Sequence, residues 1–201
     1  DPELRRRFFA RLDLLFYAAA ALPPVTRARL EALARAEARP VFFASAWGST
    51  ETAPLATSAY FPTATPAVIG LPAPGVEVKL AATEGRHELR VRGPNVTPGT
   101  WIPGGGIEPP ALDEEGFLCT GDAGRLVDEA EPERGIAFEG RLGENFKLAT
   151  GTWVVVGKLR VAVVDACAPW VQDAVIAGHD RDRLGALLFV ARPADDAAAA
   201  E

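Results

Sequence analysis

The clearest candidate for chemistry is a polar stretch, residues 49–52 (STET), which directly follows the aromatic–glycine pair Trp47-Gly48. Hydroxyl groups donate to phosphate oxygens, a carboxylate such as Glu51 holds a hard cation such as Mg²⁺, and an indole stacks on a nucleobase. The same residues also make an ordinary polar turn with a solvated carboxylate. By itself, the stretch leaves nucleotide binding and a plain turn both open.

Two further polar groups follow glycines later in the chain, Asp122 in the sequence TGD and Arg141 in the sequence GR. An aspartate at a strand end accepts hydrogen bonds from a vicinal diol such as a ribose, and it equally well caps a turn. Arg141 has the fork geometry for a ribose or a phosphate, or it pairs with a nearby glutamate at the surface.

The elements that must position the polar stretch form a strand–helix–strand unit. The apolar run 14–20 predicts a buried strand, residues 25–38 predict a helix opened by proline, and residues 41–46 predict a second strand. Such a unit has parallel strands. Because ligands bind outside the carboxyl ends of strands in open α/β sheets, the stretch after residue 46 lies where a ligand is expected.

Two amphipathic helices accompany this unit. Residues 2–12 predict a helix with Leu4, Phe8 and Leu12 on its apolar face. The helix over 25–38 is expected to turn Leu30 and Leu33 inward. Both predictions rest on the spacing of apolar residues alone.

The remaining chain predicts short strands separated by long Pro-rich and Gly-rich loops. Residues 54–75 and 98–116 read as irregular, whereas alternating apolar residues over 76–80 and 87–92 predict an antiparallel pair. Strands are expected at 117–120, 124–127 and 136–139, a strand pair at 146–148 with 153–156, a helix at 157–167, and strands at 171–177 and 184–191. The tail, residues 194–201, is expected to fray.

Composition is that of an ordinary globular protein, with 201 residues, 48% of them hydrophobic, and a net charge of −6. The acidic balance argues against nucleic acid or an anionic membrane as the main partner, and no apolar run is long enough for a membrane span. Cys119 and Cys167 lack metal-ligand spacing and read as reduced thiols of a cytoplasmic protein. The absence of Met predicts a piece of a longer protein.

Three motifs in order carry a family resemblance: WGSTE at 47–51, TGD at 120–122, and GR followed by a lysine at 140–147. Together they resemble the adenylate-forming superfamily, which includes acyl-CoA synthetases, luciferases and the adenylation domains of peptide synthetases. Residues 138–160 and 46–54 resemble the feruloyl-CoA synthetase type of aryl-acid ligase most. The resemblance covers nearly the whole chain.

The resemblance implies roles for the first motif residue by residue. Trp47 takes the place of the aromatic residue that stacks on adenine, and Gly48 lets the backbone approach the nucleotide. Ser49 and Thr50 are expected to bind the nucleotide, and Thr50 matches the hydroxyl residue that contacts phosphate. Glu51 matches the carboxylate that holds Mg²⁺, and we expect Thr50 and Glu51 to be the catalytic residues.

The later motifs complete the predicted nucleotide site. Asp122 matches the acid that grips the ribose hydroxyls, and Arg141 matches the arginine that joins it there. Lys147 and Gly151 fall in the loop that lines the thiol tunnel in the second half-reaction. Phe43, Trp47 and Tyr60 are candidates to flank an aromatic acid, although core packing explains Phe43 equally well.

The resemblance also implies an architecture and a reaction. The fold class is mixed α/β. Residues 1–141 would be the C-terminal part of a large AMP-binding domain, with a βαβ unit over about 1–60 and a β subdomain over about 61–141. Residues 142–201 would begin a mobile C-terminal domain. The reaction joins a small, aromatic carboxylic acid to the α-phosphate of ATP with Mg²⁺, and then transfers the acyl group to coenzyme A. An unpaired sheet edge leaves a homodimer as one candidate state.

Two family features are not found in these residues. Nothing resembles the phosphate loop TSGTTGxPK, and none of Lys79, Lys147 and Lys158 lies in the PxTxSGK-like context of the adenylation lysine. We therefore expect the isolated chain to be inactive. Two alternatives remain: a non-catalytic nucleotide-binding or scaffold relative, and a serine hydrolase using Ser49 with His179. The hydrolase lacks a G-x-S-x-G elbow.

Overall fold

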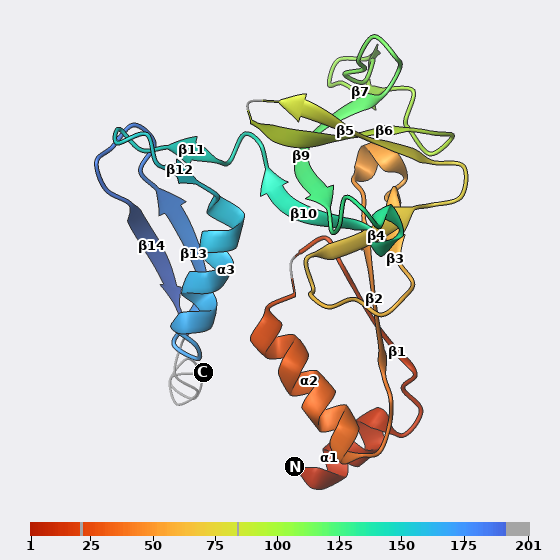
Figure 1. The fold of residues 1–201 in the computed structure, drawn as a ribbon, viewed down its shortest axis with the longest axis vertical. Helices are drawn as coiled ribbons and strands as arrows, with labels where there is room; N and C mark the ends of the chain where they lie inside the picture. The colour runs from red at the N-terminus through yellow and green to blue at the C-terminus, as the bar shows by residue number, and fades with distance from the viewer. Residues whose placement is uncertain (21, 84, 192–201) are drawn as a thin grey trace. The chain divides into compact units, whose positions relative to one another are not determined.

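The computed structural model describes residues 1–191 except 21 and 84, so the tail from residue 194 lies outside the described residues. The chain divides into two compact units, Asp1–Glu139 and Gly140–Glu201 (Figure 1). In the described residues the fold is mixed α/β, mostly sheet with few helices, which confirms the predicted fold class.

The strand–helix–strand unit is present at the start of the first unit. It consists of β1 (Leu14–Ala18), α2 (Pro24–Ala36) and β2 (Phe42–Trp47). The two strands are parallel and in register from Leu14 opposite Phe42 to Ala18 opposite Ala46, as predicted. Pro24 opens α2, where the N–H group that proline lacks would have no helical partner.

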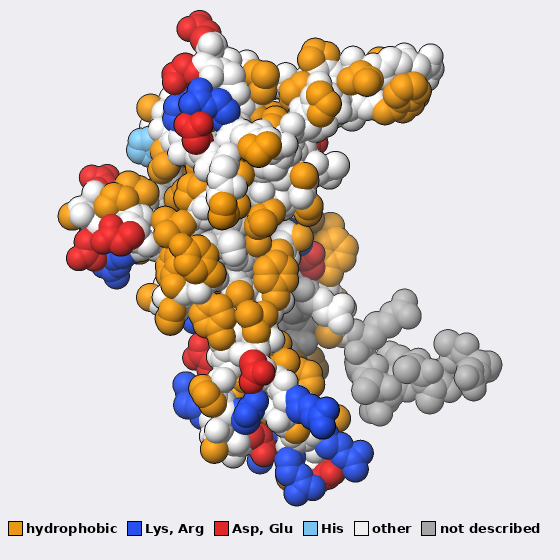
Figure 2. Space-filling view, turned by 90° about the vertical axis from the view of Figure 1, so that its right-hand side faces the viewer, with side chains coloured by type: hydrophobic (Ala, Val, Ile, Leu, Met, Phe, Trp, Pro, Cys, Tyr) orange, Lys and Arg blue, Asp and Glu red, His pale blue; other side chains and the backbone are white. Residues whose placement is uncertain are grey.

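The N-terminal helix, α1 (Pro2–Phe9), is capped by Asp1, whose side chain accepts hydrogen bonds from two N–H groups of the first turn. Its predicted buried face is wrong. Leu4 and Phe8 are 67% and 52% exposed, and the buried residue is Phe9 at 2%. Figure 2 shows basic side chains at the bottom of the view and hydrophobic side chains gathered over its middle.

The expected burial of β1 is also wrong. Leu14 and Phe16 are 47% and 61% exposed, because β1 is the outer strand of its sheet and no described element covers this face of it. In α2, Leu33 is 40% exposed and the small residue Ala34 is the buried one, at 3%. Apolar spacing therefore predicted these elements correctly but not which side of each is covered.

An eight-stranded sheet organises the described part of the first unit, in the order β1-β2-β3-β4-β10-β9-β6-β5. Its further strands are β3 (Thr57–Ala59), β4 (Val68–Pro72), β5 (Glu77–Thr83), β6 (Arg86–Arg92), β9 (Leu118–Leu126) and β10 (Ile136–Arg141). The β5–β6 pair is antiparallel as predicted. The prediction that 54–75 is irregular is wrong in part, since β3 and β4 lie there.

Two more expectations for this unit need correction. The loop over 98–116 contains a small antiparallel pair, β7 (Thr100–Trp101) with β8 (Ile107–Glu108). The two strands expected at 117–120 and 124–127 are one continuous strand, β9. Short 3₁₀ helices complete the unit, η1 (Thr50–Thr52) and η2 (Pro132–Arg134).

The second unit is a helix packed on short strand pairs, much as predicted. β11 (Phe146–Lys147) pairs with β12 (Trp153–Val154), α3 (Val156–Ala166) follows, and β13 (Val171–Ala177) pairs with β14 (Gly185–Val190). Val154, Ala174 and Ile176 form its buried core, with α3 side chains packed against them. Among the helices that the structure describes, none has both the length and the apolar character needed to cross a membrane.

Candidate functional site

The predicted phosphate-binding stretch is a tight turn at the carboxyl end of β2. The Ser49 N–H donates to Thr52 Oγ1 over 2.8 Å, and the Thr52 hydroxyl lies 3.1 Å from the Ser49 carbonyl oxygen. Thr52 is fully buried, whereas Thr50 is exposed and Glu51 is half-buried. Burial of Thr52 thus anchors the turn and leaves Thr50 and Glu51 at its surface, where a ligand can reach them.

Gly48 is required by the packing of this turn. A Cβ atom at residue 48 would lie 2.1 Å from the carbonyl oxygen of Pro54 and 2.9 Å from the Leu55 nitrogen, both backbone atoms. The turn therefore folds back on itself at a point that only glycine allows. The predicted approach of a nucleotide to Gly48 stays a prediction beside this structural requirement.

A neighbouring segment that the sequence analysis did not single out clamps the turn. The Asn95 amide donates to the carbonyl oxygens of Thr52, over 3.0 Å, and Leu55, over 2.7 Å, and the Thr97 N–H donates to the Glu51 carbonyl over 2.9 Å. Asn95 follows Gly93-Pro94, a composition that indicates a turn but gives no partner. No local signal in the sequence identifies Asn95 as a support for Glu51.

The second motif, residues 120–122, is a β-bulge inside β9 and not the end of a strand as expected. Pairing between β6 and β9 changes register between Glu88 opposite Ala123 and Arg90 opposite Cys119. Gly121 has a φ of +71°, which glycine adopts without strain. A bulge re-aims the side chain next to it, and here that side chain is Asp122.

The structure brings two of the predicted residues into direct contact. The indole Nε1 of Trp47 donates a hydrogen bond of 2.9 Å to Oδ2 of Asp122, 75 residues away in the sequence. Both side chains are buried, at 9% and 8% exposure. The Trp47 ring belongs to the core cluster of this unit, so its adenine-stacking role stays a prediction while its role in packing is observed.

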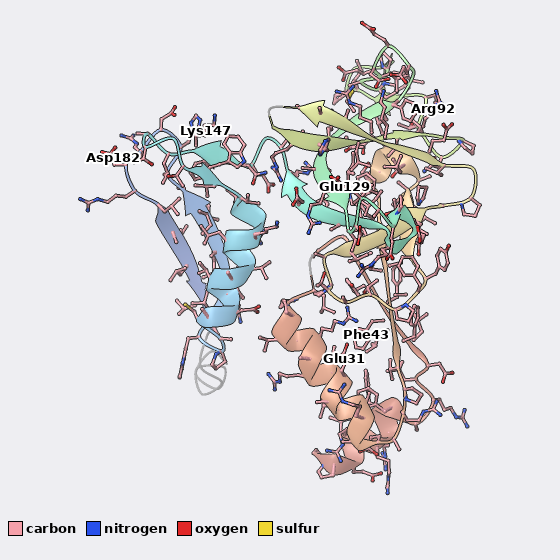
Figure 3. All side chains as sticks on the ribbon, viewed as in Figure 1. Glu31, Phe43, Arg92, Glu129, Lys147 and Asp182 are labelled. Atoms are coloured by element: carbon pink, nitrogen blue, oxygen red, sulfur yellow. The ribbon has the colours of Figure 1, made fainter. Side chains whose placement is uncertain are left out.

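Two residues proposed to flank an aromatic acid, Phe43 and Tyr60, differ in burial. Phe43 is 6% exposed and faces α2, where the Arg27 guanidinium lies 5.3 Å from the ring centre (Figure 3). Core packing accounts for this residue. Tyr60 is 68% exposed and makes an edge-on contact with Phe61.

The other predicted ligands belong to the second unit. Arg141 is exposed at the end of β10, and its carbonyl oxygen accepts a hydrogen bond from the Asn145 side chain. Lys147 is exposed on β11, labelled in Figure 3, with its ammonium 5.5 Å from the Trp153 ring. Gly151 makes the turn between β11 and β12 with a φ of +83°. Their roles toward a nucleotide or a thiol stay predictions.

Charges near the bulge are strongly coupled. Hydrogen bonds from Lys79, from the Phe117 backbone and from Arg90 hold the pKa of Asp113 well below its usual range. Hydrogen bonds to Glu88 and Asp113 raise the pKa of Arg90 further above its already high value. Burial raises the pKa of the Cys119 thiol above its ordinary value.

Metal binding rests on Glu51 alone. Across the residues that the structure describes, no group of three or more His, Cys, Asp or Glu side chains gathers into a metal-binding cluster. One half-buried carboxylate beside two hydroxyl residues fits a Mg²⁺ ion that takes most of its ligands from water and substrate phosphates. A separate depression of about 300 Å³, lined by residues 61–64 with Val127 and Arg134 among others, includes none of the predicted site residues.

Comparison with solved structures gives the class of fold. The chain superposes on Escherichia coli MenE with a bound phenylether-linked analogue of OSB-AMS, with a TM-score of 0.57, 22% identity, and coverage of 96% of this chain and 41% of that one. The anthranilate CoA ligase AuaEII, in complex with anthranoyl-AMP, gives a TM-score of 0.66, 22% identity, and coverage of 93% and 36%. The adenylation domain of a carboxylate reductase from Mycobacterium chelonae gives a TM-score of 0.65 and 23% identity, with coverage of 92% of this chain and 27% of that one. The fold is that of part of an adenylate-forming domain.

A comparison with family profiles gives a match over just under half of the chain. Residues 2–101 match the sequence profile of a family described as AMP-binding enzyme. A comparison with curated proteins gave no match. The chain spans less than half the length of the solved structures it resembles.

Proposed function

We propose that this chain is part of an ATP-dependent acid–thiol ligase that activates an aromatic carboxylic acid as its acyl-adenylate and transfers the acyl group to coenzyme A. The single observation that carries the proposal is the Trp47–Asp122 hydrogen bond of 2.9 Å, because it joins the WGSTE turn to the TGD bulge in a fold of this class. The bound OSB-AMS analogue of the MenE structure and the bound anthranoyl-AMP of the AuaEII structure support an adenylating reaction. The aryl acid and feruloyl-CoA type of specificity rest on the resemblance of residues 46–54 and 138–160.

Each residue has a defined part in the proposed reaction. Thr50 donates its hydroxyl to phosphate, Glu51 holds the divalent cation, and Asp122 accepts from the ribose hydroxyls, with Arg141 joining it there. The cation, when bound, would neutralise charge on the phosphate oxygens. Catalysis is then mostly positioning, since the acid's carboxylate must be held in line with the α-phosphorus. Lys147 and Gly151 would serve the thiol transfer.

The isolated 201 residues are proposed to be inactive, because they contain neither the phosphate loop nor the adenylation lysine of the family. We expect calorimetry to give weak or undetectable ATP binding to the isolated chain. Micromolar affinity would contradict this and would place the phosphate cradle within the present residues. Cytoplasmic localisation and a homodimer also remain proposals.

One observation favours the alternative, a non-catalytic nucleotide-binding or scaffold relative. Trp47 and Asp122, two of the predicted ligands, are buried and bonded to each other, as structural residues are. An activity assay distinguishes the ligase from the scaffold, because a scaffold gives no acid-dependent reaction with ATP under any condition.

The test measures ATP–pyrophosphate exchange by the full gene product with a panel of benzoic, cinnamic and fatty acids. We expect exchange with an aromatic acid, and a loss of at least about a hundredfold in Glu51→Ala and in Asp122→Ala, since each removes a group that acts in the transition state. Glu129→Ala, which alters an exposed carboxylate, is the matched control. Near-normal exchange in either site variant would overturn the assignment.

A further inference from the structure

We infer that Glu88 is a positioning residue of this site: its buried carboxylate holds the Gly121 bulge in the shape that presents Asp122. The contact between Glu88 and the bulge is a matter of geometry, whereas its effect on nucleotide binding rests on the proposed function. Glu88 lies on β6, 6% exposed, and neither the motifs nor the family resemblance singled it out.

Both carboxylate oxygens of Glu88 have specific partners. Oε1 accepts a hydrogen bond of 2.9 Å from the Gly121 N–H, and Oε2 accepts one of 2.8 Å from Nε of Arg90. A buried carboxylate is stable only when it is paired and hydrogen-bonded. Arg90 provides the opposite charge, and the bulge provides the second donor.

The bulge needs such an acceptor. A bulge interrupts the ladder between strands, so the N–H groups of its extra residues, here three residues opposite Leu89 alone, lack cross-strand carbonyl partners. Glu88 replaces that carbonyl for Gly121. Thr120 fixes the other side, because its hydroxyl donates to the Leu89 carbonyl over 2.5 Å and accepts from the Asp122 N–H over 3.1 Å. Glu88 and Thr120 therefore fix the backbone around Asp122, and Trp47 fixes its side chain.

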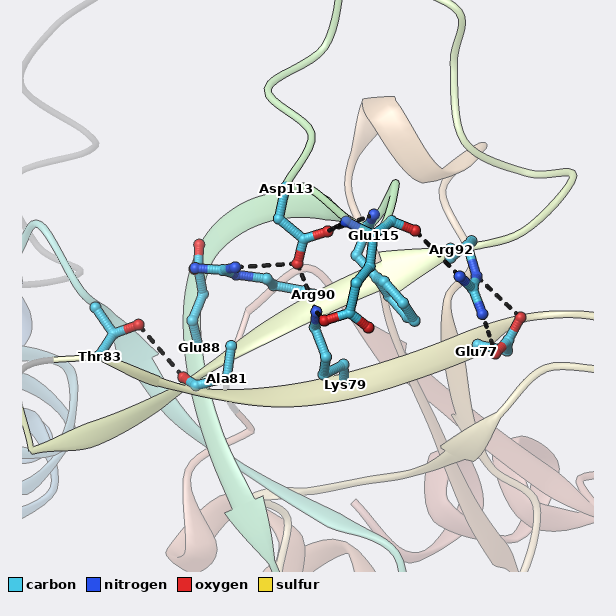
Figure 4. A network of polar contacts seen from close by, with 10 residues as sticks. Glu77, Lys79, Ala81, Thr83, Glu88, Arg90, Arg92, Asp113 and Glu115 are labelled. Atoms are coloured by element: carbon cyan, nitrogen blue, oxygen red, sulfur yellow. Dashed lines mark hydrogen bonds and ion pairs between the residues drawn. The ribbon is translucent and has the colours of Figure 1, made fainter.

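A chain of charges holds Glu88 in turn (Figure 4). Arg90 Nη1 lies 3.0 Å from Asp113 Oδ2, and Lys79 Nζ lies 2.6 Å from the same oxygen and 2.9 Å from Glu115. Asp113 also accepts from the N–H groups of Glu115 and Phe117, which fixes the turn into β9. These contacts link side chains of β5 and β6 to the bulge in β9. The last contact in the series is the hydrogen bond from the Gly121 N–H to Glu88, one residue before Asp122.

The first experiment uses the 201-residue chain and needs no ligand. Of the four tryptophan indole N–H signals in a ¹⁵N–¹H spectrum, that of Trp47 is assigned by its loss in Trp47→Phe. We expect Glu88→Ala to accelerate hydrogen exchange of this indole by about tenfold or more, because a loosened bulge releases Asp122. Glu88→Gln, which keeps an acceptor for Gly121, should restore most of the protection.

The control is Glu77→Ala, which removes a surface ion pair to Arg92 on the same hairpin and should leave the indole signal unchanged. Unchanged exchange in Glu88→Ala, or an equal change in Glu77→Ala, overturns the inference. If Glu88→Ala does not fold, the wild-type chain still decides. The Gly121 amide should be protected about a hundredfold or more against exchange, and an unprotected amide refutes the hydrogen bond to Glu88.

The second experiment measures nucleotide preference in the full gene product, as the ratio of kcat/KM for ATP to that for 2′,3′-dideoxy-ATP. Positioning of Asp122 by Glu88 predicts that Glu88→Ala lowers this ratio by about tenfold, and that Glu88→Gln restores most of it. A purely structural role would reduce activity toward both nucleotides equally and keep the ratio, which overturns the functional half. A wild-type enzyme without preference overturns the proposed role of Asp122, while the exchange data still decide whether Glu88 holds the bulge.

Discussion

Replacement of Trp47 by phenylalanine tests the bond that joins the two motifs. The substitution keeps an aromatic ring in the core and removes the indole N–H that donates to Asp122 over 2.9 Å. A hydrogen bond to a charged group contributes about 1.5–3 kcal/mol, and the lost ring volume adds about 1 kcal/mol at a position that is 9% exposed. We therefore expect Trp47→Phe to lower the free energy of unfolding by about 2.5–4 kcal/mol.

The assay is urea unfolding of the 201-residue chain, followed by far-ultraviolet circular dichroism and extrapolated linearly to water. Trp101→Phe is the matched control, since Trp101 is 71% exposed and should change stability by less than about 0.5 kcal/mol. A double-mutant cycle with Asp122→Ala isolates the pair, and we expect a coupling energy of about 1 kcal/mol or more. A coupling below about 0.5 kcal/mol, or equal effects of the two tryptophan variants, would refute the argument that this bond holds the site.

Three other perturbations follow from the packing and charges of the first unit. Gly48→Ala should cost about 2 kcal/mol or more in urea unfolding, because its Cβ would lie 2.1 Å from a backbone oxygen, whereas Gly185→Ala, with open space around it, should stay within about 0.5 kcal/mol. Phe9→Ala should cost about 3–5 kcal/mol and the adjacent Phe8→Ala less than about 1 kcal/mol, since the two are 2% and 52% exposed; equal losses would refute the observed helix face. The pKa of Asp113 is lowered on folding, so its stabilising effect is complete above its ordinary value of 3.8 and is lost as the pH falls below that value. Stability measured from pH 6 downward should therefore fall less steeply in Asp113→Asn than in the wild-type chain, and parallel curves would refute the role of this carboxylate.

Local patterns in the sequence predicted most of the elements. The parallel β1–α2–β2 unit, the β5–β6 pair and the order of elements in the second unit follow from apolar period, proline positions and strand length, which act over a few residues. The same patterns did not predict coverage. Leu14 and Phe16 are apolar and exposed, because burial of a strand face requires another element packed on it, which local spacing does not reveal.

Strands were missed where composition hides them. β3 and β4 lie in a Pro-rich and Thr-rich segment, and they are strands because β2 and β10 provide hydrogen-bond partners on either side of the pair. Thr57 illustrates the cause: it is fully buried, and its hydroxyl donates to the Ile69 carbonyl over 2.7 Å. Tertiary pairing overrides weak local propensity at such positions.

In the candidate site, the sequence pointed to the motif residues but not to the residues that support them. The sequence singled out Trp47 and Asp122 by their motifs, and the structure brings these two side chains into contact, while their roles toward a nucleotide stay predictions. Their supports were not predictable, because Asn95 and Glu88 bind backbone groups that lie 33 to 43 residues away in the sequence. Neither support carries a signature of its own, since an asparagine after Gly-Pro or a glutamate in an alternating strand has many possible partners.

The position of Asp122 shows why the local pattern of residues 120–122 did not predict their structure. Thr-Gly-Asp looks like a strand end, since glycine and aspartate both disfavour a continuing strand. In the structure β9 continues through the motif, because Glu88 and the Leu89 carbonyl supply the hydrogen bonds that the bulge takes out of the ladder. A bulge in the middle of a paired strand is held from both sides, whereas a strand end is held from one. Asp122, which we propose to bind a ribose, therefore gains orientation from this placement, at the cost of an ion pair between the buried Glu88 and the half-buried Arg90 that only the folded sheet can stabilise.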